Sequence, residues 1–123
     1  MEMDSAFVRN WIENWNQRNL ESILACFATD VEFTSPKALQ FAGSATLRGK
    51  DALRAYWTSA LQRIHDLHFV LDHWVWDSNR RELLILYIAR LNGVRTRACE
   101  ILRFRTDGLI DSGEGMYGAP VEE

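Results

Sequence analysis

Cysteine and proline are scarce in this sequence, and an excess of positive charge is missing. The 123 residues include two cysteines and two prolines, and the formal net charge is -3 with a pI near 5.6. Cys26 and Cys99 fit neither a metal-ligand spacing nor a CxxC motif, so we expect two buried, reduced thiols. The acidic balance lacks the electrostatic signature of a nucleic-acid binder, which argues against nucleic acid as a partner.

Long hydrophobic runs are absent as well. No apolar stretch reaches membrane-spanning length, and no basic segment followed by an apolar one begins the chain. Repeats, low-complexity tracts and linkers are also missing. We therefore expect one soluble, cytoplasmic domain over residues 1–123 with no membrane partner, long enough to bury most of its apolar surface unaided.

Aromatic residues, in contrast, are frequent. They make up 11% of the chain, and five of them are tryptophans. Tryptophan fills hydrophobic cores, but its indole N–H needs a hydrogen-bond partner, which also suits it to the rims of ligand pockets. The aromatic content therefore favours a well-filled core and leaves room for a pocket.

The first half of the chain shows helical periodicity. Apolar side chains recur at helical spacing in residues 4–19, with Asp4 or Ser5 as the N-cap. The same spacing recurs in residues 19–27 and in residues 49–64. Three helices are therefore predicted before residue 65.

Two short segments separate the second predicted helix from the third. Residues 31–36 predict a strand that ends at Pro36, because proline removes a backbone donor. Residues 37–48 predict a loop, in which Leu39 and Phe41 either fold over a pocket mouth or fill a gap in the core.

From residue 67 the periodicity changes to the alternation of strands. Four strands are predicted, at residues 67–76, 82–91, 95–105 and 109–117, and each gap between them contains a turn signal. Helices precede these strands along the chain, so the predicted class is α+β with an antiparallel sheet.

An Asn-Gly pair between two of these strands sets their register. Asn92-Gly93 favours a two-residue type I′ hairpin, in which Ile85 faces Glu100. Glu100 then shares one face of the sheet with three apolar neighbours, Leu83, Tyr87 and Leu102. We expect desolvation there to raise the pKa of Glu100, unless a histidine pairs with the carboxylate and keeps it charged.

The opposite face of the same hairpin is also apolar at its centre. Its residues are Leu84, Leu86, Ile88, Cys99 and Ile101, with arginines at the edges. This apolar patch is too large for an exposed sheet. We expect two copies of the chain to cover it by forming a homodimer about a two-fold axis.

Three segments carry motifs of a known family: RNLESILACFATDVEFTSP, GKDALRAYWTSAL and CEILRFRTDGLI. They contain an Asp-Val at the entry to the first strand, a Gly-x-x-Ala-Leu helix start and a Phe-x-x-Asp-Gly turn. In these motifs the chain resembles the nuclear-transport-factor-2-like superfamily, which includes the ketosteroid isomerases and the SnoaL-like polyketide cyclases. The resemblance implies a cystatin-like conical roll, with three N-terminal helices packed on a strongly curved antiparallel sheet that encloses a pocket.

The resemblance also assigns positions within that pocket. Glu100 falls where the ketosteroid isomerases keep an inward acid that donates a hydrogen bond to the substrate oxyanion. Ser35 occupies the position of their catalytic base, and Trp11 occupies the position of the tyrosine in their oxyanion hole. Phe27 and Trp57 occupy the positions of two supporting tyrosines. Serine is no unaided base near neutral pH, and an indole can only donate a hydrogen bond. The resemblance thus implies an aromatic pocket nearly free of hydroxyls, and it argues against steroid isomerisation by that mechanism.

The candidate site therefore combines one acid with an aromatic wall. Glu100 is the candidate catalytic residue. The candidate substrate-binding residues are Trp11, Trp15, Phe33, Ser35, Tyr56, Trp57, Ile85, Tyr87, Leu102 and Tyr117. Asp111 shares the inward alternation of Tyr117 on the last strand.

The three histidines do not form a predicted metal site. His65, His68 and His73 are spread over a helix end and a strand, where alternation places His68 and His73 on opposite faces. Whether His68 or His73 lines the pocket is left open by the sequence. No cofactor is predicted.

Two functions fit these observations. The first is an isomerase, lyase or cyclase acting on a small hydrophobic metabolite that bears a carbonyl group, with Glu100 as the acid. The second is a non-catalytic module that holds an apolar ligand. The inward acid favours the first and the missing base at Ser35 favours the second, while no phosphate loop, nucleophile elbow or metal motif indicates another enzyme class.

Overall fold

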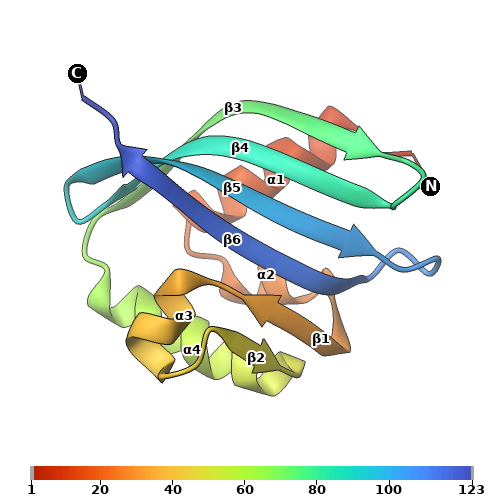
Figure 1. The fold of residues 1–123 in the computed structure, drawn as a ribbon, viewed down its shortest axis with the longest axis horizontal. Helices are drawn as coiled ribbons and strands as arrows, with labels where there is room; N and C mark the ends of the chain where they lie inside the picture. Colours follow the sequence, from red (N-terminus) through yellow and green to blue (C-terminus); the bar gives the residue numbers. More distant parts are fainter. Residues whose placement is uncertain (1, 123) are drawn as a thin grey trace.

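The structure is a computed structural model that describes residues 2–122 as helices packed on one sheet (Figure 1). The helices are α1 (Ser5–Asn16), α2 (Leu20–Leu24), α3 (Pro36–Ala42) and α4 (Lys50–Arg63). The strands are β1 (Phe27–Thr34), β2 (Thr46–Arg48), β3 (Leu67–Asp77), β4 (Glu82–Leu91), β5 (Val94–Phe104) and β6 (Ile110–Pro120). The predicted α+β class is confirmed, as are the four strands of the second half.

The sheet has the strand order β2-β1-β6-β5-β4-β3. Neighbouring strands are antiparallel except β1 and β6, which run parallel, so the sheet is mixed and not purely antiparallel as predicted. A parallel pair needs a long crossover connection, and the whole stretch from α3 to β5 separates β1 from β6. In Figure 1, α1 lies behind the strands β3 to β5 and α4 lies behind β1 and β2, so one face of the sheet is covered by helices.

The segment predicted as a loop, residues 37–48, is instead the helix α3 followed by the short strand β2. The Ser35 side chain caps α3 by accepting a hydrogen bond of 3.1 Å from the Lys37 N–H, and Pro36 occupies the first turn. Gly43 ends the helix with a φ of 79°. The chain therefore has a fourth helix, which periodicity misses because seven residues are too few to show it.

Three smaller findings concern the ends of predicted elements and the cysteines. Asp4 is the N-cap of α1, since its carboxylate accepts the Phe7 N–H at 3.0 Å. Phe27, predicted on the second helix, begins β1. Cys26 and Cys99 are free thiols but only half-buried, and burial raises the pKa of both.

The predicted register of the central hairpin is confirmed. Asn92 and Gly93 both have positive φ, 50° and 84°, as a type I′ turn requires. Ile85 pairs with Glu100, and Leu91 pairs with Val94 at the turn. The carboxylate of Glu100 therefore lies on the face of the sheet that the helices cover.

Two irregularities, one in β3 and one in β6, change which residues point inward. The register of β3 shifts between Leu71 and His73, so the extra residue, Asp72, places His68 and His73 on one face. Both histidines are exposed there, and the prediction that they point to opposite faces is wrong. The register of β6 shifts in the same way around Asp111, which therefore does not share the alternation of Tyr117.

Within residues 2–122, no helix combines the length and the apolar character needed to cross a membrane.

Candidate functional site

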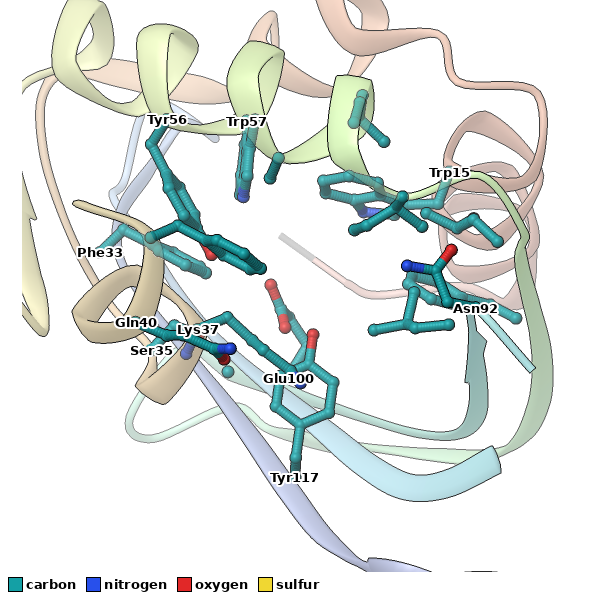
Figure 2. Close-up of a pocket in the computed structure, with 18 of the residues that line it drawn as sticks. Trp15, Phe33, Ser35, Lys37, Gln40, Tyr56, Trp57, Asn92, Glu100 and Tyr117 are labelled. Carbon is teal, nitrogen blue, oxygen red and sulfur yellow. The ribbon is translucent and has the colours of Figure 1, made fainter. Parts of the chain in front are cut away.

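A cavity of about 250 Å³ lies between α3, α4 and the helix-covered face of the sheet (Figure 2). Eight of the predicted site residues line it: Trp15, Phe33, Ser35, Tyr56, Trp57, Tyr87, Glu100 and Tyr117. The structure therefore brings one acid, three tyrosines and two tryptophans together from five different elements: α1, α4, β4, β5 and β6.

Glu100 is the acid of this cavity. It is 6% exposed, and Figure 2 shows its carboxyl group directed toward the centre of the pocket. Within residues 2–122, the carboxyl oxygens make no hydrogen bond and no ion pair, and burial raises the pKa of Glu100 to about 8. The predicted rise in pKa is confirmed, so the carboxyl group is mostly protonated at neutral pH and can donate a hydrogen bond.

Gly115 provides the space that the carboxyl group occupies. It pairs with Glu100 in the β5–β6 register, and a Cβ atom at position 115 would lie 3.3 Å from Glu100 Oε2. The same Cβ would lie 3.6 Å from Ser35 Oγ. A glycine at this position therefore leaves room for Glu100 and Ser35 on the same side of the pocket.

Hydroxyl groups surround Glu100, contrary to the prediction of a pocket nearly free of them. Burial, with a smaller contribution from the nearby Glu100, raises the pKa of Tyr56 to about 12 and raises the pKa values of Tyr87 and Tyr117 as well. The hydroxyl groups of Tyr87 and Tyr117 lie near each other, and the hydroxyl group of Tyr56 lies near Ser35. All three phenols stay protonated near neutral pH, which makes them neutral donors and acceptors.

Ser35 has a structural task at this site. Its side chain is buried, it accepts the Lys37 N–H as the cap of α3, and it contacts the Tyr56 hydroxyl. These contacts give Ser35 no basic partner, so it does not act as a base.

The aromatic wall is a set of ring contacts, of which those of Trp57 are edge-on and that between Phe69 and Tyr87 is tilted. Trp57 lies 5.0 Å from Trp15 and 5.2 Å from Phe33 between ring centroids, and Phe69 lies 4.8 Å from Tyr87. Figure 2 shows the indole nitrogen of Trp57 at the end of the ring that points into the pocket. The wall is therefore apolar with one further N–H donor available to a ligand.

Three residues predicted for the pocket wall lie in the core instead. Trp11 packs against Phe7 and Phe27, and Ile85 and Leu102 are fully buried. The inward face of the sheet is longer than the pocket, and side chains from the helices fill the rest of it. Alternation identifies the inward face but not the part of it that stays open, which explains the error.

None of the three histidines lines the pocket, which answers the question that the sequence left open for His68 and His73. Asp111 is also absent from the wall, and its Oδ1 atom is buried with no hydrogen-bond partner among the described residues. Within residues 2–122, no group of three or more His, Cys, Asp or Glu side chains is placed to hold a metal ion.

Eleven further residues line the pocket that are not among the candidate substrate-binding residues: Lys37, Gln40, Phe41, Ala60, Leu61, Ile64, Leu67, Phe69, Leu91, Asn92 and Gly115. The first three come from α3, and the Ser-Pro cap with a glycine seven residues after the proline was the signal for that helix. Phe41 lies on the pocket wall, whereas Leu39 is 56% exposed and does not line the pocket.

Asn92 belongs both to the hairpin turn between β4 and β5 and to the lining of the pocket. Its Oδ1 atom accepts the backbone N–H groups of His65 at 2.8 Å and Asp66 at 3.1 Å. These bonds hold the connection between α4 and β3 beside the turn. The residue that sets the register of the sheet therefore also closes one end of the pocket (Figure 2).

The SnoaL-like domain family model matches residues 8–112. Among solved structures, a SnoaL-like protein of unknown function from Burkholderia thailandensis has 33% identity and a TM-score of 0.80, over 93% of this chain and 92% of that one. An NTF2-like protein of unknown function from Burkholderia pseudomallei has 22% identity and a TM-score of 0.80, over 96% and 92% of the two chains.

A third structure, TerC co-crystallised with polyporic acid, has 13% identity and a TM-score of 0.75, over 90% of this chain and 88% of that one. At this identity the similarity shows a shared fold. A comparison with curated proteins found no match.

Proposed function

Since this chain belongs to the SnoaL-like family, we propose that its pocket binds a small, largely apolar metabolite with a carbonyl group and that Glu100 donates a hydrogen bond to the carbonyl oxygen. In this proposal Glu100 is the catalytic acid of an isomerase, lyase or cyclase. One observation carries the proposal: a protonated carboxyl group, without a hydrogen-bond partner among the described residues, points into an aromatic cavity.

The geometry suits a reaction in which negative charge develops on a carbonyl oxygen. Such charge forms when a neighbouring C–H bond loses its proton or when a nucleophile adds to the carbonyl carbon. A donor that is already in place in a dry site stabilises this charge without reorganisation. With a pKa near 8, Glu100 also exists in both protonation states around neutral pH, so it can give and take a proton.

The volume of the cavity limits the size of the ligand. An engineered cavity of about 150 Å³ holds benzene, so about 250 Å³ holds one or two rings. A four-ring steroid is too large to be enclosed. The co-crystallisation of TerC with polyporic acid supports the view that this fold accommodates an organic ligand.

A binding module without catalysis is the second candidate function, and one observation favours it. Among the described lining residues, no imidazole and no second carboxylate accompanies Glu100, and Ser35 is engaged as a helix cap. A site of this kind recognises a carbonyl oxygen without supplying a separate base.

Acetophenone and ethylbenzene test carbonyl recognition, because the two probes differ mainly in the carbonyl oxygen. We expect acetophenone to bind more tightly, as followed by the fluorescence of the pocket residues Trp15 and Trp57. Glu100→Leu should abolish the preference and Glu100→Gln, which keeps a donor, should retain it. Glu114→Gln, on the opposite side of the sheet, is the control. Equal affinity for the two probes in the unmodified protein would contradict the proposal.

We further propose a cytoplasmic homodimer that forms through the outer face of the sheet. Leu84, Leu86, Ile88, Cys99 and Ile101 are only half-buried in the single chain. Val70, Val75 and Met116, which are 51%, 47% and 46% exposed, extend the patch to the neighbouring strands. A second copy would cover this apolar surface. The free cysteines favour a reducing compartment.

A further inference from the structure

Lys37 is a cation on the pocket wall that the proposed reaction does not use. It lies in the first turn of α3, is half-buried, and lies beside Tyr117 at one side of the pocket (Figure 2). Its Nζ atom lies 5.1 Å from the centre of the Tyr117 ring. Within residues 2–122 the Lys37 ammonium group forms no ion pair, so its positive charge is not balanced by a carboxylate.

The other titratable groups of the pocket do not balance this charge either. Tyr56 from α4, Tyr87 from β4 and Tyr117 from β6 are the titratable groups that face Glu100, and their raised pKa values keep them neutral. Glu100 is itself mostly protonated at neutral pH. The lining of the pocket therefore carries a net charge close to +1, from Lys37.

A partly dehydrated cation beside an apolar cavity is best compensated by an anionic group on the ligand. We infer that the ligand is a small aromatic or alicyclic oxo acid, whose carboxylate pairs with the Lys37 ammonium group while its carbonyl oxygen faces Glu100. This inference rests on the proposed function and adds the charge of the substrate class to it. Lys37 is then a specificity-determining residue.

The probes 4-acetylbenzoate and 4-acetylbenzamide test the inference, because they share the ring and the carbonyl group and differ in charge. We expect the unmodified protein, well below the pKa of Glu100, to bind 4-acetylbenzoate about tenfold more tightly or better, the scale of a charge-assisted hydrogen bond. Lys37→Met keeps the apolar stem and the backbone N–H that Ser35 caps. This variant should lose the preference and bind 4-acetylbenzamide as before.

The chain supplies a matched control, because Lys37 and Lys50 are its two lysines. Lys50 begins α4 and does not line the pocket, so Lys50→Met should keep the preference for the anion. A second readout is the pH dependence: affinity for 4-acetylbenzoate should fall as Glu100 ionises, since two negative groups then share the pocket. Glu100→Gln should remove this dependence.

The outcomes separate the inference from the proposed function. Equal affinity for the two probes, an unchanged preference in Lys37→Met, or an equal loss in both lysine variants would overturn the inference and leave the proposed function standing. Failure of both probes to bind at millimolar concentration, together with failure of acetophenone, would overturn both.

Discussion

Gly115 lies opposite Glu100 across strands β5 and β6, and the missing side chain of the glycine is what admits the carboxyl group to the pocket. We expect Gly115→Ala to displace the carboxyl group, because the added methyl group would lie 3.3 Å from its Oε2 atom. Binding of acetophenone should weaken several-fold. The free energy of unfolding should change by about 1 kcal/mol or less, for two reasons. The carboxyl group of Glu100 is the flexible end of a side chain and can rotate away from the added methyl group, and alanine restricts the unfolded chain more than glycine does.

Gly113→Ala and Gly118→Ala serve as comparisons for Gly115→Ala. At Gly113 the added methyl group would lie 2.9 Å from the Phe33 ring, a rigid group, so we expect a loss of about 1–3 kcal/mol in the free energy of unfolding. At Gly118, which does not line the pocket, ligand binding should be unchanged. Denaturant unfolding and probe titration of the three variants measure both quantities. Unaltered binding in Gly115→Ala would show that the carboxyl group does not depend on this glycine.

The stability of the protein should depend on pH through Glu100. Folding raises the pKa of Glu100 from 4.5 to about 8, so the folded state holds this proton more tightly than the unfolded state. Stability from this group is fully present below the unfolded pKa, falls as the pH rises from 4.5 through about 8, and then stays constant. The slope is at most about 1.4 kcal/mol per pH unit, and the total loss is on the order of a few kcal/mol.

Glu100→Gln isolates this contribution, because the amide does not titrate. The free energy of unfolding of the variant minus that of the unmodified protein should increase across this pH range. Chemical denaturation at several pH values measures the difference. Parallel curves for the two proteins would mean that the carboxyl group is not desolvated in solution.

Removing the hydroxyl group of Ser35 tests its role as a helix cap. Ser35→Ala leaves the Lys37 N–H without an acceptor and should cost about 1 kcal/mol of stability. Ser35→Thr keeps the capping oxygen and should retain most of it. If the Glu100→Leu and Ser35→Ala variants lost ligand affinity to the same extent, Ser35 would contact the ligand directly.

The outer face of the sheet provides a test of the proposed dimer. Leu86 lies in the middle of this apolar patch, paired with Cys99 on β5. Leu86→Glu should convert a dimer to a monomer, because an interface cannot bury an unpaired charge cheaply. Leu39→Glu, at an exposed position on α3, is the control and should stay dimeric. Analytical ultracentrifugation measures the mass, and a monomeric unmodified protein would reject the dimer.

The position of Glu100 could be predicted from the sequence because two strong local signals agree. The alternation of β4 and β5 defines two faces, and Asn92-Gly93 fixes how the strands pair. The elements that were missed carry weaker signals. The helix α3 has only seven residues, and the register shifts at Asp72 and Asp111 add one residue each. Features this short do not change a periodicity that is measured over a longer window.

The extent of the pocket depended on tertiary packing, which alternation does not encode. Ile85 and Glu100 are direct partners on the same face, yet only Glu100 borders the cavity. The hydroxyl groups around Glu100 were misjudged for a related reason. The comparison with the ketosteroid isomerases considered only the positions at which those enzymes carry their own hydroxyl groups. Tyr56, Tyr87 and Tyr117 stand at other positions, and they come together only in the folded structure.

The helix α3 has a consequence for how this site can diversify. The acid, its glycine partner and most of the aromatic wall belong to the sheet and to α4, where a substitution disturbs the core. Lys37, Gln40 and Phe41, in contrast, stand on one short surface helix whose ends are set by Ser35, Pro36 and Gly43. Related chains can therefore exchange these three side chains, and with them the ligand, while keeping the acid and the fold unchanged.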